Sequence, residues 1–465
     1  MSLARTKLQN ALTSFFNSEI FIALYSAFVA IVSFLDCNAL ILSVILLVFS
    51  FIFFTQKDLK PVFVPLTMSY FSLRFIEGVF SLDWFFYLSA AVFVCSVIYY
   101  IAINRPSFRP TKNLNALFFY AASYVVAGSF AANYMADKLY FQQLIMLAML
   151  VPALALLVLL AANSDFTDPE YVFKILFATG TVIAVQCFGV AISADNYFED
   201  IFLKDLFFLN WGIYSGPITV VLFSVPSCFY LAVKHKKFTF PLVLAAFLHI
   251  AAGYLTASRA AFLALAPFLV VCFIATLAVL LKGDRKRMWI SFSVCVGLVL
   301  VAALVFALVN KDIFSRLLDL FSSRGLDLGR SKVWADSIAY FLENPVFGLG
   351  LLHHQGTPQG NASYIWMSHN TFLQALASLG IVGFTGIMIH TVCKYKTFFK
   401  RNYFSYFGLL IVISTELYGL IDCLMPAPYY VFPLFLLLIG ADRVHYENER
   451  PLPLRKKYGK TETPL

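Results

Sequence analysis

The sequence has few charged residues. Only 13% of its 465 residues are Asp, Glu, Lys or Arg, whereas 61% are hydrophobic. Soluble domains average roughly 25% charged residues, and the mean hydropathy here is +0.81. The shortage of charge excludes a soluble protein and places the chain in a lipid bilayer. A cleavable signal with a short apolar core and a small-residue cleavage site is also lacking, so we expect the first long apolar stretch to act as an uncleaved anchor.

Cysteine pairs and clustered carboxylates are missing as well. The eight cysteines are scattered, most of them within apolar runs, and none forms a CxxC pair. This pattern is typical of small buried residues rather than of a disulfide framework or a metal site. In the long polar stretch at 310–369, Asp327 and Asp336 are isolated and form no DxD-type cluster. The sequence therefore predicts neither a metal nor another cofactor.

Long apolar segments make up most of the chain. They predict about 12–14 transmembrane helices, since roughly 20 apolar residues cross a bilayer. The fold class expected is thus an all-α polytopic membrane protein. No internal repeat is evident, so residues 1–440 are predicted to form a single integral membrane domain. A short basic tail follows at 441–465 and is predicted to be disordered.

The distribution of Lys and Arg predicts how the chain crosses the membrane. With the N-terminus inside and alternating spans, about 25 of the 34 basic residues fall in cytoplasmic segments, as the positive-inside rule requires. The net charge of +9 is therefore interpreted as a topology signal and a contact with anionic membrane lipids, not as a nucleic acid site. Both termini are predicted to be cytoplasmic, and the 310–369 stretch is predicted to be extracytoplasmic.

Two polar positions interrupt apolar runs on the predicted outer face. Arg259, in TASRAAF, divides two apolar runs too long for one span, so the chain must turn there. It is either a snorkelling residue at a helix end or an anion clamp for phosphate oxygens. His369, in SHNTFLQALASLGIVGF, is either an interfacial residue beside the N-cap candidates Ser368 and Asn370 or a general base. Gly380 in the run behind it predicts a closely packed helix.

The outer stretch contains one predicted helix with a clear end. Its sequence is RSKVWADSIAYFLENPVFGLG, in which apolar residues recur at helical spacing and Arg330 stands near the helix start. Asn344–Pro345 ends the helix, because proline disfavours helical geometry in the residue before it. The apolar stripe is predicted to lie on the membrane or to cap the helical bundle.

A few charges fall at membrane depth, where they are costly and indicate function by default. Arg74 and Glu77 are three residues apart on one predicted helix face. They form either a self-neutralising structural pair or part of a substrate cavity. Asp422 is expected at the outer lip of the penultimate span, where it can hydrogen-bond the hydroxyl groups of a substrate.

Four of these elements occur in the order found in a known family. TASRA, R-x-x-x-W in an outer helix, ENPVFGLG and HNTFLQALASLGIVGF together resemble the O-antigen ligase and polymerase superfamily over residues 205–440. The resemblance implies a GT-C-type glycosyltransferase with an extracytoplasmic helical cap. Arg259 and Arg330 resemble the family's diphosphate-binding arginines, and His369 resembles its catalytic histidine. His353 and His354 are further candidates for the substrate cavity.

The resemblance also implies substrates and location. The donor would be a glycan on undecaprenyl diphosphate, and the acceptor a carbohydrate or glycolipid at the outer face of a bacterial cytoplasmic membrane. No metal would be needed. Ligase and polymerase use the same donor chemistry, so the sequence leaves both open. A transporter or flippase for a lipid-linked or anionic substrate is the alternative from another class, although the predicted charges cluster at one face rather than at the midplane.

Overall fold

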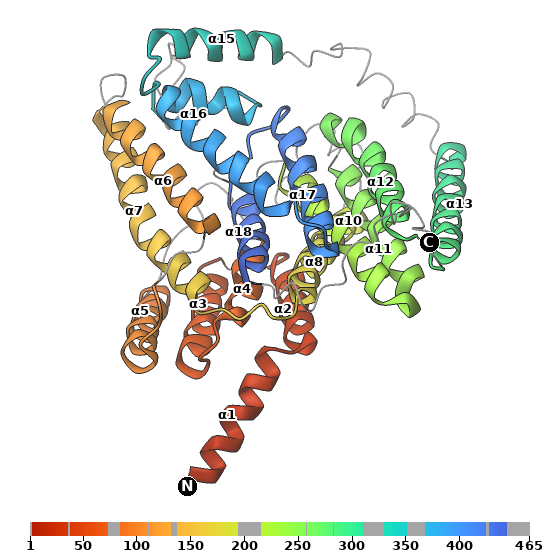
Figure 1. The fold of residues 1–465 in the computed structure, drawn as a ribbon, viewed down its shortest axis with the longest axis horizontal. Helices are drawn as coiled ribbons and strands as arrows, with labels where there is room; N and C mark the ends of the chain where they lie inside the picture. The colour runs from red at the N-terminus through yellow and green to blue at the C-terminus, as the bar shows by residue number, and fades with distance from the viewer. Residues whose placement is uncertain are drawn as a thin grey trace, which may run out of the picture.

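A computed structural model describes most of the chain as helices (Figure 1). The described residues are 2–35, 38–72, 84–108, 112–131, 137–193, 215–256, 258–281, 283–309, 330–350, 368–424 and 427–443. Within these ranges there are helices and no β-strand, which confirms the predicted all-α class. The predicted cavity residues Arg74, Glu77, His353 and His354 lie outside the described residues.

The α-helices are α1 (Ser2–Phe16), α2 (Glu19–Val32), α3 (Asn38–Thr55), α4 (Phe63–Met68), α5 (Trp84–Asn104), α6 (Lys112–Phe130), α7 (Asp137–Ala162), α8 (Glu170–Ser193), α10 (Ser215–Lys234), α11 (Thr239–Leu255), α12 (Arg259–Val279), α13 (Arg285–Val309), α15 (Arg330–Glu343), α16 (Thr371–Phe398), α17 (Tyr403–Gly419) and α18 (Pro428–Arg443). Short 3-10 helices occur at η1 (Lys60–Val62), η2 (Ser69–Ser72) and η4 (Lys236–Phe238).

Several of these helices are suited to crossing a membrane. Seven of the described helices are long and apolar enough, and the pair α1–α2, bent by 60°, raises the number to eight. Four further apolar stretches, in α6, α7, α12 and α18, are shorter. The protein is therefore a multi-pass membrane protein. The predicted number of 12–14 spans is higher because it counts apolar segments that form shorter helices.

The most buried helix is α10. It is apolar on all sides, and 94% of its spanning window lies inside the protein, as expected for a helix surrounded by others. It packs against α8, α11, α12, α17 and α18. By contrast, α5 and α13 have only 17% of their windows buried and present their side chains outward. The core thus sits around α10, and lipid-facing helices surround it.

Charged residues mark one end of the helical bundle. Lys236 in η4 forms an ion pair of 3.0 Å with Asp284, just before α13. The start of α11 and the end of α12 therefore lie at this end. Helix α11 ends at Leu255 and α12 begins at Arg259, so Arg259 lies at the opposite end. The predicted turn at Arg259 is confirmed.

The same reasoning places the end of α17. Tyr406, near the start of α17, donates a 2.9 Å hydrogen bond to the carbonyl of Ala275, near the end of α12. The start of α17 thus lies beside the end of α12. Because the two helices pack together, they run antiparallel, and the end of α17 lies beside the start of α12. Asp422, which follows α17, therefore lies at the same end of the bundle as Arg259.

A buried ion pair joins the last three helices. Lys394 of α16 is 4% exposed and contacts Glu416 of α17, which is 14% exposed. Lys394 also donates to the hydroxyl of Tyr430 in α18 at 3.2 Å. Two opposite charges in contact at membrane depth satisfy each other, whereas either one alone would be costly. The pair therefore fixes α16, α17 and α18 relative to one another.

Helix α16 is broken at Gly380. This residue has φ 59° and ψ −159°, which is not helical. The sequence predicts one closely packed helix here, and the structure corrects this to two halves that meet at a kink. Gly383 does show close packing, since a Cβ there would lie 2.8 Å from Leu379 Cδ1. The first half, residues 371–379, follows directly on His369.

The 345–350 segment supplies the hydrogen bonds that the break removes. Two of its amides donate to carbonyls at the end of the first half, and two of its carbonyls accept from amides at the start of the second half. These bonds join Leu349 N to Ala377 O (2.9 Å), Gly350 N to Ser378 O (2.8 Å), Ile381 N to Pro345 O (2.8 Å) and Val382 N to Val346 O (3.3 Å). The broken helix therefore keeps its backbone groups paired, as an apolar environment requires.

Two glycines allow the backbones to meet so closely. Gly348 has φ 68° and Gly380 has φ 59°, both in the left-handed region. A Cβ at Gly348 would lie 2.6 Å from Gly380 N, and a Cβ at Gly380 would lie 2.6 Å from Phe347 N. Both distances are shorter than real Cβ contacts. The predicted end of α15 at Asn344–Pro345 thus has a structural role, because the chain beyond it packs into the kink.

Replacing Gly380 with alanine tests this arrangement. We expect Gly380→Ala to destabilise the protein by at least about 2 kcal/mol, because the left-handed conformation alone costs roughly 1–2 kcal/mol and the new Cβ overlaps backbone. The measurement is thermal unfolding in detergent followed by circular dichroism. Gly297→Ala in α13 is the matched control, since nothing lies within 4 Å of its Cβ position. Equal unfolding temperatures for Gly380→Ala and the wild type would contradict this account of the kink.

Candidate functional site

His369 occupies the sharp turn that leads into α16. Its φ is 51°, an uncommon conformation for a residue with a side chain. Asn370 follows as the N-cap of α16, and its side chain accepts from Phe372 N at 3.0 Å and Leu373 N at 3.1 Å. The predicted cap at Asn370 is confirmed. The side chain of His369 is 46% exposed, so the turn presents the imidazole outward instead of packing it.

Hydrogen bonds on both sides hold this turn. The Ser368 hydroxyl donates to the carbonyl of Asn370 at 2.7 Å and accepts from its amide at 3.3 Å. The amide of Ser368 donates to the side-chain carbonyl of Gln374 at 2.8 Å. Ser368 is fully buried, so these hydrogen bonds hold the backbone next to His369 in place. Such strain and support are typical of functional positions.

Asp422 faces His369 from the turn after α17. Its Oδ1 lies 3.8 Å from Nδ1 of His369, an ion-pair distance. The other oxygen, Oδ2, accepts a 2.9 Å hydrogen bond from the hydroxyl of Tyr418, and Oδ1 accepts from the amide of Cys423 at 2.8 Å. The carboxylate is therefore oriented by two donors and directed toward the imidazole.

The environment of Asp422 favours its charged form. Burial acts to raise the pKa of this carboxyl, but the neighbouring His369, the amide of Cys423 and the hydroxyl of Tyr418 outweigh it and lower the pKa below its usual value. Asp422 is thus an anion at neutral pH. An anion beside Nδ1 can orient the imidazole, and it leaves the other ring nitrogen for a substrate.

The start of α16 is joined directly to the turn that carries Asp422. Thr371 donates to the carbonyl of Asp422 at 3.0 Å and accepts from the amide of Leu424 at 3.1 Å. The side-chain amide of Asn370 donates to the carbonyl of Leu420 at 3.0 Å. The relative position of His369 and Asp422 is therefore set by backbone contacts, not by the two side chains alone.

Arg330 begins α15 and belongs to the same region. Its partly buried side chain exerts an electrostatic effect on the phenol of Tyr418, the residue that donates to Asp422. Helix α15 packs on α16 and lies along the upper edge of the molecule, above the start of α16 (Figure 1). The structure thus brings His369 and Asp422 together and places Arg330 at the start of the helix that packs on α16. The predicted helix is present and packs on α16, while Ile338 and Leu342 of its apolar stripe remain exposed.

Arg259 lies at this end of the bundle, but the structure describes only its backbone. It is the first residue of α12, after Ser258, and its side chain lies outside what the structure describes. Two other histidines, His249 and His390, are buried, with 1% and 2% of their surface exposed. Within the described ranges, no three His, Cys, Asp or Glu residues are grouped as a metal site would need.

The sequence did not single out several residues that build the site. Tyr418 and Thr371 both contact Asp422, and Gln374 supports the turn at His369. Tyr418 lies more than forty residues after Thr371 and Gln374, and each of the three is an ordinary residue type within an apolar helix. Only the four-residue step from Tyr418 to Asp422, close to one helical turn, hinted at a contact.

Chemically, the site combines a cation, an exposed imidazole and a buried carboxylate at one end of a membrane bundle. An imidazole supported by a carboxylate can accept a proton from a hydroxyl. A guanidinium can bind phosphate oxygens with two parallel hydrogen bonds. The arrangement is therefore able to activate a hydroxyl nucleophile beside an anionic leaving group.

Comparison with known proteins agrees with this assembly. Residues 244–388 match the family described as O-Antigen ligase. The match spans α12, α13 and α15, most of α11 and α16 as far as residue 388, and so includes Arg259, Arg330 and His369. No curated protein matches the chain. The resemblance indicated by the four sequence motifs is thus confirmed over residues 244–388, the part of the chain that matches the O-antigen ligase family.

Proposed function

We propose that the protein is a metal-independent, inverting glycosyltransferase of GT-C type. It moves a glycan from an undecaprenyl-diphosphate carrier to a carbohydrate acceptor at the outer face of a bacterial cytoplasmic membrane. The observation that carries the proposal is the pairing of His369 with Asp422, with Arg330 at the start of the helix that packs on α16. The family match includes His369 and Arg330, whereas Asp422 lies beyond the matched range.

The reaction follows from the roles that these groups can take. His369 accepts the proton of the acceptor hydroxyl as its oxygen bonds to the anomeric carbon of the donor. The bond between that carbon and the diphosphate oxygen breaks, and the electron pair leaves with undecaprenyl diphosphate. Asp422 stabilises the imidazolium, and attack opposite the leaving group inverts the anomeric centre.

The arginines replace a metal in this proposal. Charge grows on the diphosphate as the bond breaks, and fixed cations that bind this charge more tightly in the transition state accelerate the step. In this proposal Arg330, at the start of α15, and Arg259, at the start of α12, bind the diphosphate. Both stand at the end of the bundle opposite the Lys236–Asp284 pair.

The orientation of the protein supports the choice of donor. The basic loop residues that the sequence assigns to the cytoplasm, such as Lys236 and Arg285, lie at one end, and the candidate site lies at the other. Nucleotide sugars are cytoplasmic, so a transferase on the outer face needs a donor that has already crossed the membrane. A lipid-linked glycan meets this need.

Alanine at His369 tests the proposed reaction. We expect His369→Ala to lower glycan transfer by about 10²–10⁴-fold, the contribution of a general base, while the protein still inserts and folds because the side chain is 46% exposed. Cells that carry the variant would be examined for surface glycan and for glycan retained on the carrier lipid. Full-length polymer stranded on the carrier identifies a ligase, and single repeat units identify a polymerase. Normal surface glycan would favour a transporter and contradict the proposal.

A pair of variants in α15 tests the anion-binding role. We expect Arg330→Ala to reduce transfer by roughly 10²–10³-fold, as for the loss of one donor to a developing anion. Lys332→Ala, two positions along the same helix and exposed, is the matched control and should remain active. The measurement is the initial rate of transfer with purified protein. Equal rates for the two variants would show that a general positive charge on α15, not Arg330 itself, is what matters.

A further inference from the structure

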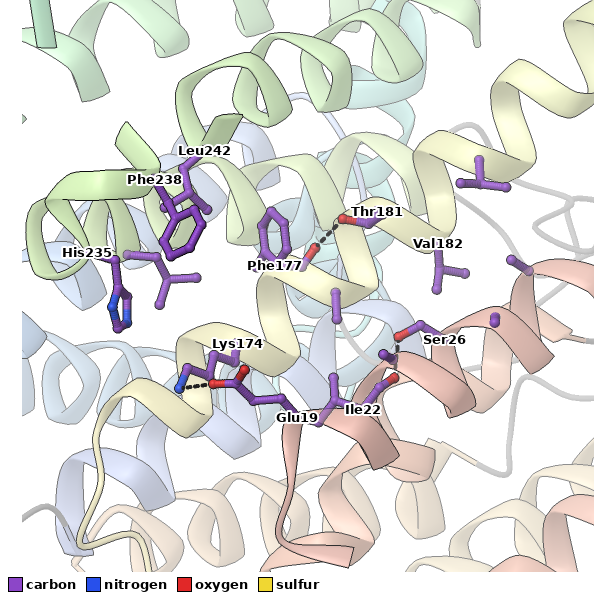
Figure 2. A pocket seen from close by; sticks show the side chains of 16 residues that line it. Glu19, Ile22, Ser26, Lys174, Phe177, Thr181, Val182, His235, Phe238 and Leu242 are labelled. Carbon is purple, nitrogen blue, oxygen red and sulfur yellow. Dashed lines mark hydrogen bonds and ion pairs between the residues drawn. The ribbon is translucent and has the colours of Figure 1, made fainter. Parts of the chain in front are cut away.

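A long apolar groove runs between α2, α8 and the α10–α11 connection, away from the candidate site. Its volume is about 550 Å³. Small residues form its floor, among them Ala23 and Ala27 of α2 and Ala178 of α8. Larger side chains, such as Phe177 and Phe238, form its sides (Figure 2). We call this the α2–α8 groove.

The length of the α2–α8 groove matches half of a membrane. Its lining residues extend along α2 from Glu19 to Ala30 and along α8 from Lys174 to Val185. Each stretch rises about 16 Å at 1.5 Å per residue, and one leaflet contributes about 15 Å of the hydrocarbon core. The groove therefore has the length of a single acyl chain in one leaflet.

The interior of the groove offers little to a polar ligand. Its two hydroxyls, Ser26 and Thr181, donate to carbonyls of their own helices, Ile22 O at 2.7 Å and Phe177 O at 3.1 Å. A peptide or a sugar would leave its own polar groups unpaired against these walls, which is costly. A hydrocarbon chain meets no such penalty.

Charged groups gather at one end only (Figure 2). Lys174 Nζ lies 2.7 Å from Glu19 and 3.5 Å from Glu170, and His235 Nε2 lies 2.8 Å from Glu170. His235 directly precedes η4, whose Lys236 marks the end of the bundle opposite His369. The charged end of the groove thus faces the other leaflet from the candidate site, so the groove is separate from the proposed donor site.

The charges at this end of the groove favour a zwitterionic headgroup, which carries a positive and a negative charge. Glu19 is 76% exposed and free to turn toward a bound cation, whereas Lys174 is only 23% exposed. This end of the groove therefore presents an exposed carboxylate beside a partly buried ammonium, two opposite charges 2.7 Å apart. The ammonium of a lipid headgroup can replace Lys174 as the ion-pair partner of Glu19. The phosphate of the same headgroup can then form an ion pair with Lys174.

We propose that the α2–α8 groove binds one zwitterionic glycerophospholipid that carries a primary ammonium in its headgroup. One acyl chain lies along the alanines of α2. The phosphate contacts Lys174, and the ammonium contacts Glu19. The inference is independent of the glycosyltransferase proposal, because it concerns the opposite leaflet and none of the residues at the candidate site.

The test is native mass spectrometry of the purified full-length protein after lipid removal. Phosphatidylethanolamine and phosphatidylglycerol with identical acyl chains are titrated separately. We expect the wild type to bind at least about fivefold more phosphatidylethanolamine. Glu19→Gln should abolish this preference, because it removes the partner of the ammonium. Its exposed position means that the fold should be unaffected.

A second pair of variants tests the place of binding. Ala27→Phe fills the groove from an exposed position on α2, and we expect it to lower phosphatidylethanolamine binding several-fold. Ala91→Phe, on the exposed face of α5, is the matched control and should bind as the wild type does. Equal binding of the two lipids, a preference for phosphatidylglycerol, or equal binding by both phenylalanine variants would overturn the proposal.

Discussion

The hydrogen bonds between the 345–350 segment and the break in α16 are the constraint on which the candidate site depends. A helix broken at membrane depth leaves carbonyls on one side and amides on the other, and lipid cannot pair with either. Leu349 and Gly350 supply donors, while Pro345 and Val346 supply acceptors. This pairing allows the first half of α16 to leave the axis of the second half, and His369 stands at the start of that first half.

The positions of the candidate site residues follow from this arrangement. Thr371, in the first half of α16, holds the turn that contains Asp422, and α15, which leads into the 345–350 segment, begins with Arg330. These connected backbone segments thus set the positions of His369, Asp422 and Arg330. The buried contact of Lys394 with Glu416 ties the second half of α16 to α17. A change in either connection would move His369 relative to Asp422.

The sequence predicted much of this fold because the relevant signals are local. Apolar length predicted the helices, Asn344–Pro345 predicted the end of α15, and Asn370 predicted the start of α16. The break at Gly380 could not be predicted in this way, since a glycine in an apolar run also fits close helix packing. Its left-handed conformation depends on Gly348, more than thirty residues earlier. Tyr418 and Thr371 were missed for the same reason, because their roles arise only when α16 and α17 meet.

The most direct measurement of the central claim is a reaction with defined components. The purified protein in EDTA would be given an undecaprenyl-diphosphate glycan of known anomeric configuration and a carbohydrate acceptor. The account predicts a new glycosidic bond of inverted configuration, seen by nuclear magnetic resonance, and release of one undecaprenyl diphosphate for each bond formed. A product that retains the donor's configuration, a requirement for divalent metal, or movement of the intact donor across a vesicle membrane with no new bond would contradict it.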